Sequence, residues 1–193
     1  MTGSIAIFAS GAGSNAREIV RHLHAHSRFR VARIACNRPD ASVLGVAGAA
    51  GIPVIPLERE RFFRGDAYLP ELRTAGIDAI VLAGFLWKVP AGLVDAYRDR
   101  ILNIHPALLP DHGGKGMYGS RVHEAVIRRG DTHSGITIHV VDERYDHGRT
   151  LFQARLDVRP DDTPDTLATR IHALEHRHVP TVVEAFLENT ISC

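Results

Sequence analysis

The chain has 193 residues, enough for a single domain with a sizeable buried core. Its 45% hydrophobic and 23% charged residues are typical of a soluble globular protein. The formal net charge is only +1, so the chain does not show the excess of basic residues that is typical of nucleic-acid-binding proteins. No apolar run approaches the roughly 18 residues that a membrane helix needs. The two cysteines, Cys36 and Cys193, form no disulfide framework, and with no visible signal peptide they predict a cytoplasmic protein.

The first hundred residues alternate short apolar strands with helices. Strands are expected at 5–9, 31–35, 52–57, 78–83 and 100–104, and helices at 16–24, 43–50, 67–75 and 90–97, with an irregular stretch at 58–66. Such alternation predicts an α/β fold of the Rossmann-like type, with a mostly parallel sheet and helices on both faces.

The second half changes character. A loop rich in proline and glycine is expected at 106–119, a helix at 121–129, strands at 135–141 and 150–158, and a last helix from 164 to about 188 with a bend at Pro180. Neither a repeat nor a linker is visible, so the simplest prediction is one domain over 1–193. The N-terminal half would bind phosphate and the C-terminal half would carry catalysis.

A glycine turn, Ser10-Gly11-Ala12-Gly13-Ser14-Asn15-Ala16, joins the first strand to the first helix. Glycines let the backbone approach an anion, and the free N–H groups of the helix point at it. The turn also fits a dinucleotide-binding pattern, but Cys36-Asn37-Arg38 stands where that pattern needs an acid. A third alternative is a tight turn selected for packing alone. Of the three, we favour a binding site, or anion seat, for a single phosphate on a small substrate.

The stretch Asn103-Ile104-His105-Pro106 predicts a pair of functional side chains. Residues two apart in a strand share a face, so Asn103 and His105 point the same way, and Pro106 ends the strand. An amide can donate to a developing oxyanion, and a histidine can act as acid or base near neutral pH. The alternative is a hydrogen-bonded core histidine beside a structural asparagine.

An acidic loop follows at 142–148. Asp142, Glu143 and Asp146 could form a solvated surface turn. Alternatively, one of these carboxylates faces His105, and the ion pair would then raise the pKa of the histidine.

Five motifs occur in the following order along the chain: 10–15, Leu82-Ala83-Gly84-Phe85, 103–110, Gly135-Ile136-Thr137-Ile138-His139, and Asp146 before Gly148. Together and in this order, they resemble the folate-dependent formyltransferase family. The glycine turn most resembles the members that act on glycinamide ribonucleotide. The resemblance implies transfer of the formyl group of 10-formyltetrahydrofolate, a co-substrate, to the glycine amine of that ribonucleotide in de novo purine synthesis, without a metal.

The same resemblance implies the site residues. Asn103, His105 and Asp146 would be catalytic, with His105 charged through Asp146. The ribonucleotide would be held by Gly13, Ser14, Asn15 and Glu175. The folate pocket would be lined by Leu86, Trp87, Lys88, Val89, Asn103, Asp142, Glu143, Arg144, Tyr145 and Asp146.

Some features depart from the family or leave alternatives open. The family's folate-side arginine falls near Gly65, with Arg64 one position away, and Lys115 in the loop 111–119 could reach a phosphate or be solvated. His172 and His176 have a spacing that can bind zinc, but no third ligand is evident.

The rival functions are a formyltetrahydrofolate hydrolase, a formyltransferase for another amine, and a silent nucleotide-binding module. The hydrolase is disfavoured because the first strand starts at Ile5, which leaves no room for an N-terminal regulatory domain. The expected partners are small-molecule substrates, without nucleic acid or membrane, in a monomer or homodimer.

Overall fold

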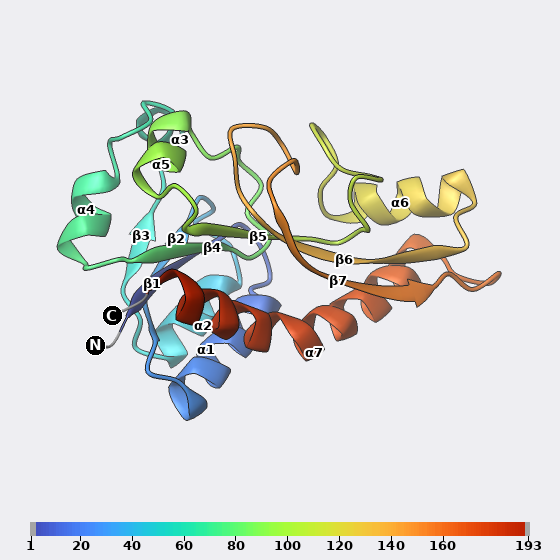
Figure 1. The fold of residues 1–193 in the computed structure, drawn as a ribbon, viewed down its shortest axis with the longest axis horizontal. Helices are drawn as coiled ribbons and strands as arrows, with labels where there is room; N and C mark the ends of the chain where they lie inside the picture. The colour runs from blue at the N-terminus through green and yellow to red at the C-terminus, as the bar shows by residue number, and fades with distance from the viewer. Residues whose placement is uncertain (1–2, 192–193) are drawn as a thin grey trace.

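The computed structural model describes residues 3–191, so Cys193 lies outside the described residues. A seven-stranded sheet runs through the molecule in the order β3-β2-β1-β4-β5-β6-β7 (Figure 1). The strands are β1 (Ser4–Ala9), β2 (Arg30–Cys36), β3 (Val54–Pro56), β4 (Ala79–Leu82), β5 (Ile101–His105), β6 (His133–Val140) and β7 (Thr150–Asp157). The first five pair in parallel, and β6 and β7 add an antiparallel hairpin beside β5. The predicted mostly parallel α/β fold is confirmed.

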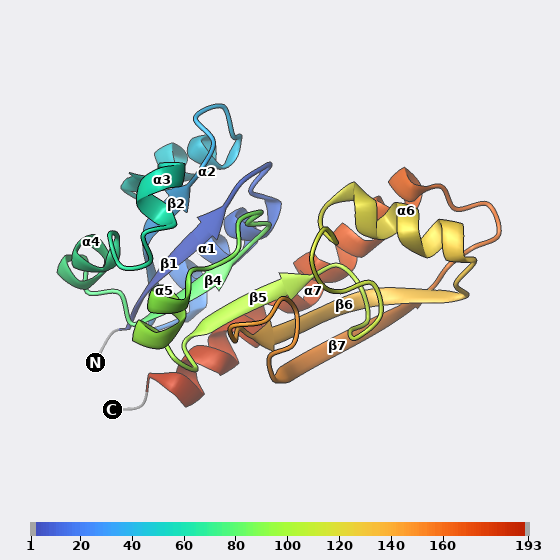
Figure 2. The same ribbon diagram turned by 90° about the horizontal axis from the view of Figure 1, so that it is seen from above.

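Helices cover both faces of the sheet (Figures 1 and 2). They are α1 (Ser14–His26), α2 (Val43–Ala49), α3 (Arg59–Phe62), α4 (Leu69–Thr74), α5 (Ala91–Ala96), α6 (Ser120–Arg129) and α7 (Pro164–Thr190). In β1, Ile5 and Ile7 pack into the core beneath α1, α2 and α7, whereas Ala6 and Phe8 pack into the core beneath α3, α4 and α5. The strand is therefore apolar throughout, as expected of a parallel strand buried on both sides.

One segment differs from the sequence prediction. The stretch 58–66, expected to be irregular, contains the short helix α3, because Phe62 is buried against Phe8 and the aromatic rings around it. The last helix, as predicted, extends from Pro164 past Pro180 and ends at Thr190, with Val179 and Val183 fully buried against the sheet. That burial outweighs the hydrogen bond that proline removes from a helix.

The carboxyl ends of the central strands meet at one edge of the sheet. The amide of Ser10, directly after β1, donates to the carbonyl of Gly84, just beyond β4 (3.1 Å), and the Ser10 hydroxyl accepts from the amide of Leu86 (3.0 Å). β5 ends beside them at His105, where Pro106 follows. Parallel α/β sheets bind ligands at this edge. Within residues 3–191, no helix is both long and apolar enough to cross a membrane.

Candidate active site

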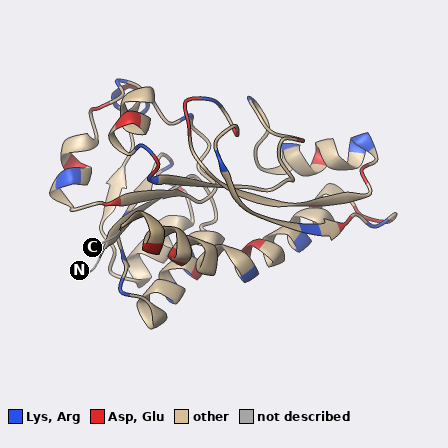
Figure 3. Cartoon of the chain, viewed as in Figure 1, with Lys and Arg blue, Asp and Glu red and all other residues tan. Residues whose placement is uncertain are grey.

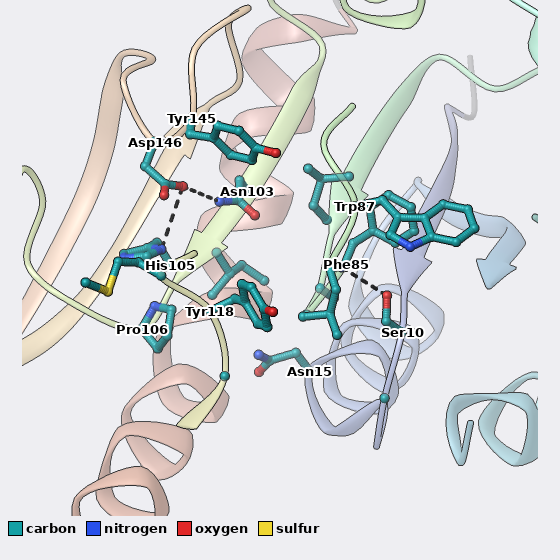
Figure 4. A pocket seen from close by; sticks show the side chains of 18 of the residues that line it. Ser10, Asn15, Phe85, Trp87, Asn103, His105, Pro106, Tyr118, Tyr145 and Asp146 are labelled. Atoms are coloured by element: carbon teal, nitrogen blue, oxygen red, sulfur yellow. Dashed lines mark hydrogen bonds and ion pairs between the residues drawn. The ribbon is translucent and has the colours of Figure 1, made fainter. Parts of the chain in front are cut away.

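A cavity of about 530 Å³ lies along this edge of the sheet (Figure 4). Most of the residues predicted for the site line it. The lining comprises mainly the glycine turn 10–15, the segments 82–89 and 103–106, the loop residues 116–120, the segments 141–142 and 144–146, and His123, His139, Ala168, His172 and Glu175. One cavity therefore brings together segments from both halves of the chain.

The glycine turn opens into the cavity at the start of α1. Gly13 adopts a φ of 73°, and a Cβ added there would come within 2.7 Å of the Val43 side chain. The amide of Val43 also donates to the carbonyl of Gly11 (3.1 Å), so the turn packs tightly on α2. The first amides of α1 beside Ser14 and Asn15 have no intrahelical acceptor and offer an anion seat.

A buried hydrogen bond joins the first and last helices at this end of the cavity. Asn15 Nδ2 donates to Glu175 Oε2 (2.9 Å), across 160 positions of sequence. Burial raises the pKa of Glu175, although Asn15 and His172 act in the opposite direction. No described residue contributes a hydrogen-bond partner for Asn15 Oδ1. Asn15 and Glu175 thus present polar atoms to the cavity from opposite ends of the sequence.

Asn103 and His105 share one face of β5, as their spacing predicts. Leu102 and Ile104, which alternate with them along the strand, point to the other face of the sheet, into the core beneath α1, α2 and α7. His105 is only 3% exposed and donates from Nε2 to the carbonyl of His112 (2.8 Å). Its Nδ1 lies 3.7 Å from Asp146 Oδ1 (Figure 4).

Asp146 returns over β5 from the loop between β6 and β7. A Cβ added at Gly148 would lie 1.7 Å from the carbonyl oxygen of Val140, so this tight return requires glycine. Asp146 Oδ2 accepts from the amide of Gly114 (2.8 Å), and Oδ1 accepts from Asn103 Nδ2 (3.4 Å). Burial raises the pKa of Asp146, but hydrogen bonds and the nearby histidines outweigh it, so the pKa falls below its usual range and the carboxylate is ionised.

The predicted effect of this carboxylate on His105 has the right sign, but the expected charged ring is wrong, because other contributions outweigh it. Asp146 does raise the pKa of His105, as does the bond to His112. Burial outweighs both, and His139 and His112 add charge repulsion, so the pKa of His105 lies below its ordinary 6.5. His105 is therefore neutral at pH 7 rather than charged through Asp146.

His139, in the family-like strand 135–139, orients the Asn103 amide through a contact that the motifs alone do not specify. The two residues are cross-strand partners, and Asn103 Nδ2 lies 3.0 Å from His139 Nε2. His139 Nδ1 lies 3.0 Å from the carbonyl of Val140, which can only accept. In neutral His139 the proton thus sits on Nδ1, and Nε2 accepts from Asn103. The signal was available in the register of an antiparallel pair.

Aromatic rings border the other end of the cavity. Leu86, Trp87, Lys88 and Val89 all line it, and the Trp87 ring lies 5.5 Å from that of Phe62, centroid to centroid. Across the opening, Lys88 Nζ lies 5.2 Å from the centroid of the Tyr145 ring. This end offers a flat apolar surface with a cation at its rim.

Three residues considered for substrate binding lie outside the lining. Glu143 turns away toward Arg98 (3.5 Å), while its neighbours Asp142, Arg144, Tyr145 and Asp146 face the cavity. The side chains of Arg64 and Lys115 are exposed outside the lining.

His123 lines the cavity, and burial together with His172 and His105 lowers its pKa to about 4. His172 lines the cavity as well. In the part of the chain that the structure describes, no group of three or more histidine, cysteine, aspartate or glutamate side chains could hold a metal ion.

Comparison with known proteins defines the class of this chain. The family model described as formyl transferase matches residues 4–183, so the chain belongs to the formyl transferase family. Within that family its relatives include phosphoribosylglycinamide formyltransferases. The protein of that name from Bacillus subtilis is 35% identical over 94% of this chain and 93% of its own length. The resemblance inferred from the motifs is thus confirmed.

Other relatives agree. A chloroplastic phosphoribosylglycinamide formyltransferase from Arabidopsis thaliana is 42% identical, and the match covers 97% of this chain and 66% of that longer protein. The crystal structure of phosphoribosylglycinamide formyltransferase from Bacillus halodurans has a TM-score of 0.87 at 36% identity, with 95% of each chain covered. The chain thus spans about two thirds of the plant relative and nearly all of the bacterial ones.

Proposed function

We propose that this chain transfers the formyl group of 10-formyltetrahydrofolate to the glycine amine of glycinamide ribonucleotide, a step of de novo purine synthesis. The observation that carries the proposal is the meeting of Asn103, His105 and Asp146 in a single cavity. On one side of them lies the anion seat of the glycine turn, and on the other the surface around Trp87. A phosphorylated amine and a flat heteroaromatic carrier bound at these two ends would react between them. The names of the relatives support the same reaction.

Asn103 would stabilise the oxyanion. Attack of the neutral amine on the formyl carbon forms a C–N bond and leaves negative charge on the formyl oxygen. Asn103 Nδ2 makes a short contact with His139 and a longer one, 3.4 Å, with Asp146. The longer contact is the one that a substrate oxygen would replace, and a fixed donor of this kind strengthens as charge develops.

His105 and Asp146 would move the proton. With Nε2–H donated to His112, neutral His105 presents an Nδ1 lone pair toward Asp146. That nitrogen accepts the proton released by the attacking amine, directly or through water, and ionised Asp146 stabilises the imidazolium. The bond between the formyl carbon and N10 of the folate then breaks, and N10 takes the proton.

The anion seat and the buried pair would hold the ribonucleotide. We assign its phosphate to the amides of Gly13, Ser14 and Asn15, and a further polar contact to Glu175. Leu86, Trp87, Lys88 and Val89 together with Asp142, Arg144 and Tyr145 would contact the folate. Glu143, implied by the family resemblance, would contribute only if its bond to Arg98 were broken.

We also propose a single domain over 1–193, a monomer or homodimer, and a cytoplasmic location. Cys36 carries a buried free thiol, which is compatible with a reducing compartment. Light scattering after size-exclusion chromatography would measure the oligomeric state, and imaging of a tagged protein in its own cell would test the location.

A deformylation assay tests the reaction. Folded protein is mixed with 10-formyltetrahydrofolate, with and without glycinamide ribonucleotide, and loss of the formyl group is followed by absorbance. We expect turnover only with the ribonucleotide, and its loss in His105→Ala but not in the control His24→Ala, an exposed residue of α1. Turnover without the ribonucleotide would indicate water as the acceptor, and no turnover in either mixture would refute the proposal.

A further inference from the structure

One loop contacts two members of the catalytic trio through its backbone. The carbonyl of His112 accepts from His105 Nε2 (2.8 Å), and the amide of Gly114 donates to Asp146 Oδ2 (2.8 Å). Because a carbonyl can only accept, neutral His105 keeps its proton on Nε2. The position of the His112 carbonyl therefore decides which ring nitrogen of His105 carries the lone pair.

The side chain of His112 anchors this carbonyl. His112 Nε2 donates to Asp131 Oδ2 (2.5 Å), just beyond the end of α6. The side chains are only 8% and 15% exposed, so the contact is largely shielded from water. A shielded charge-assisted hydrogen bond holds its geometry better than a solvated one.

Asp131 is itself held in place. Arg129 donates from Nε to Asp131 Oδ1 (2.6 Å) and from a terminal nitrogen to Asp111 Oδ2 (2.8 Å). Hydrogen bonding to Arg129 and His112 keeps the pKa of Asp131 below its usual value despite partial burial. The start of the loop is thus tied to the end of α6 by a chain of charged groups that does not touch the cavity.

The backbone at His112 is also unusual. Its φ is 52°, in the left-handed region that favours glycine. Glycine at this position would adopt the same conformation freely but would lose the tie to Asp131. The two contributions of the residue, backbone shape and side-chain anchor, can therefore be separated by substitution.

We propose that His112, anchored by Asp131 and Arg129, is a positioning residue that holds His105 in the tautomer with its proton on Nε2 and so leaves Nδ1 as the reactive nitrogen. The inference rests on the proposed function for its effect on turnover. Its structural part, the tautomer of His105, is independent of the identity of the substrates.

The test compares His112→Gly and Asp131→Asn with the matched control Asp111→Asn. The control also removes a carboxylate from Arg129, but it leaves in place the side-chain hydrogen bond between His112 and Asp131. In the ligand-free proteins, nitrogen–proton correlation spectra of histidine side chains report the tautomer of His105. In the assay with 10-formyltetrahydrofolate and glycinamide ribonucleotide, kcat and both KM values are measured separately.

We expect the wild type and the control to show the Nε2–H tautomer, and His112→Gly and Asp131→Asn to show a mixture. In those two variants kcat should fall roughly tenfold to a hundredfold, the scale of an ångström of misplacement, with both KM values changed by less than about threefold. An unchanged tautomer in both, or an equal effect in the control, would overturn the inference. If His112→Gly does not fold, Asp131→Asn decides by the same spectra. A wild type without turnover would refute the proposed function, while the spectra would still test the tautomer.

Discussion

Replacing Gly13 by alanine should lower the free energy of unfolding by about 3 kcal/mol. At a φ of 73°, an L side chain costs roughly 1–2 kcal/mol. The added Cβ would lie 2.7 Å from Val43 Cβ and Cγ2 and 2.8 Å from its Cα, well inside the ~3.5 Å at which carbon atoms rest. Because a backbone atom is among these, α2 must shift, and forced overpacking of this kind costs about 1–3 kcal/mol. The lower entropy of the unfolded alanine chain returns about 0.4–1 kcal/mol.

Gly11→Ala is the matched control. A Cβ at Gly11 meets no atom within 4 Å, and its backbone is outside the left-handed region, so its stability should change by less than about 0.5 kcal/mol. Urea unfolding of both variants measures the difference, and ribonucleotide KM should rise in Gly13→Ala because the anion seat moves with the turn. Equal urea midpoints for the two variants would refute the packing argument for Gly13.

Three further substitutions test the site. Asn103→Ala should lower kcat roughly a hundredfold or more, and steady-state kinetics with a change in KM alone would argue against an oxyanion donor. Asp146→Asn removes the carboxylate that raises the pKa of His105, so the pH–rate limb of His105 should move to lower pH, and an unmoved limb would contradict the contact. Glu175 has a raised pKa, so its stabilising contribution is full below its ordinary value of 4.5 and is lost as pH rises through the folded value. The stability of Glu175→Gln relative to the wild type, measured by urea unfolding, should therefore increase as the pH rises from 4.5 to 8. The ribonucleotide KM of the variant should also be higher than that of the wild type. A stability difference that stays constant across this pH range would contradict the burial argument.

The sheet was predictable because its strands carry a local signal. The run Ile5 to Ala9 is apolar on both faces. β5 ends at His105 because the next residue, Pro106, cannot continue the strand. The helix α3 was missed because only one of its residues, Phe62, is buried, and a single buried ring leaves no periodic pattern. Local patterns therefore gave the order of elements, whereas short elements held by one tertiary contact escaped them.

The site was predictable in part for the same reason. The shared face of Asn103 and His105 follows from the two-residue period of a strand. The approach of Asp146 to His105 joins residues 41 positions apart and depends on the tight return at Gly148. No local pattern encodes such a distance, and the resemblance to a family supplied it instead. The anchor at His112 had no counterpart in the motifs, so it emerged only from the contacts.

The direction in which the pKa of His105 is shifted shows why burial must be weighed against charge. From sequence, a carboxylate beside a histidine implies a raised pKa, but the strand places the ring where water is excluded, and desolvation outweighs the carboxylate. Under the proposed reaction this order suits the chemistry, because a neutral ring can take the proton of the attacking amine whereas an imidazolium cannot. Once the proton arrives, Asp146 Oδ1 and the His112 carbonyl face the two ring nitrogens, so the cation would be stabilised at the moment when it forms.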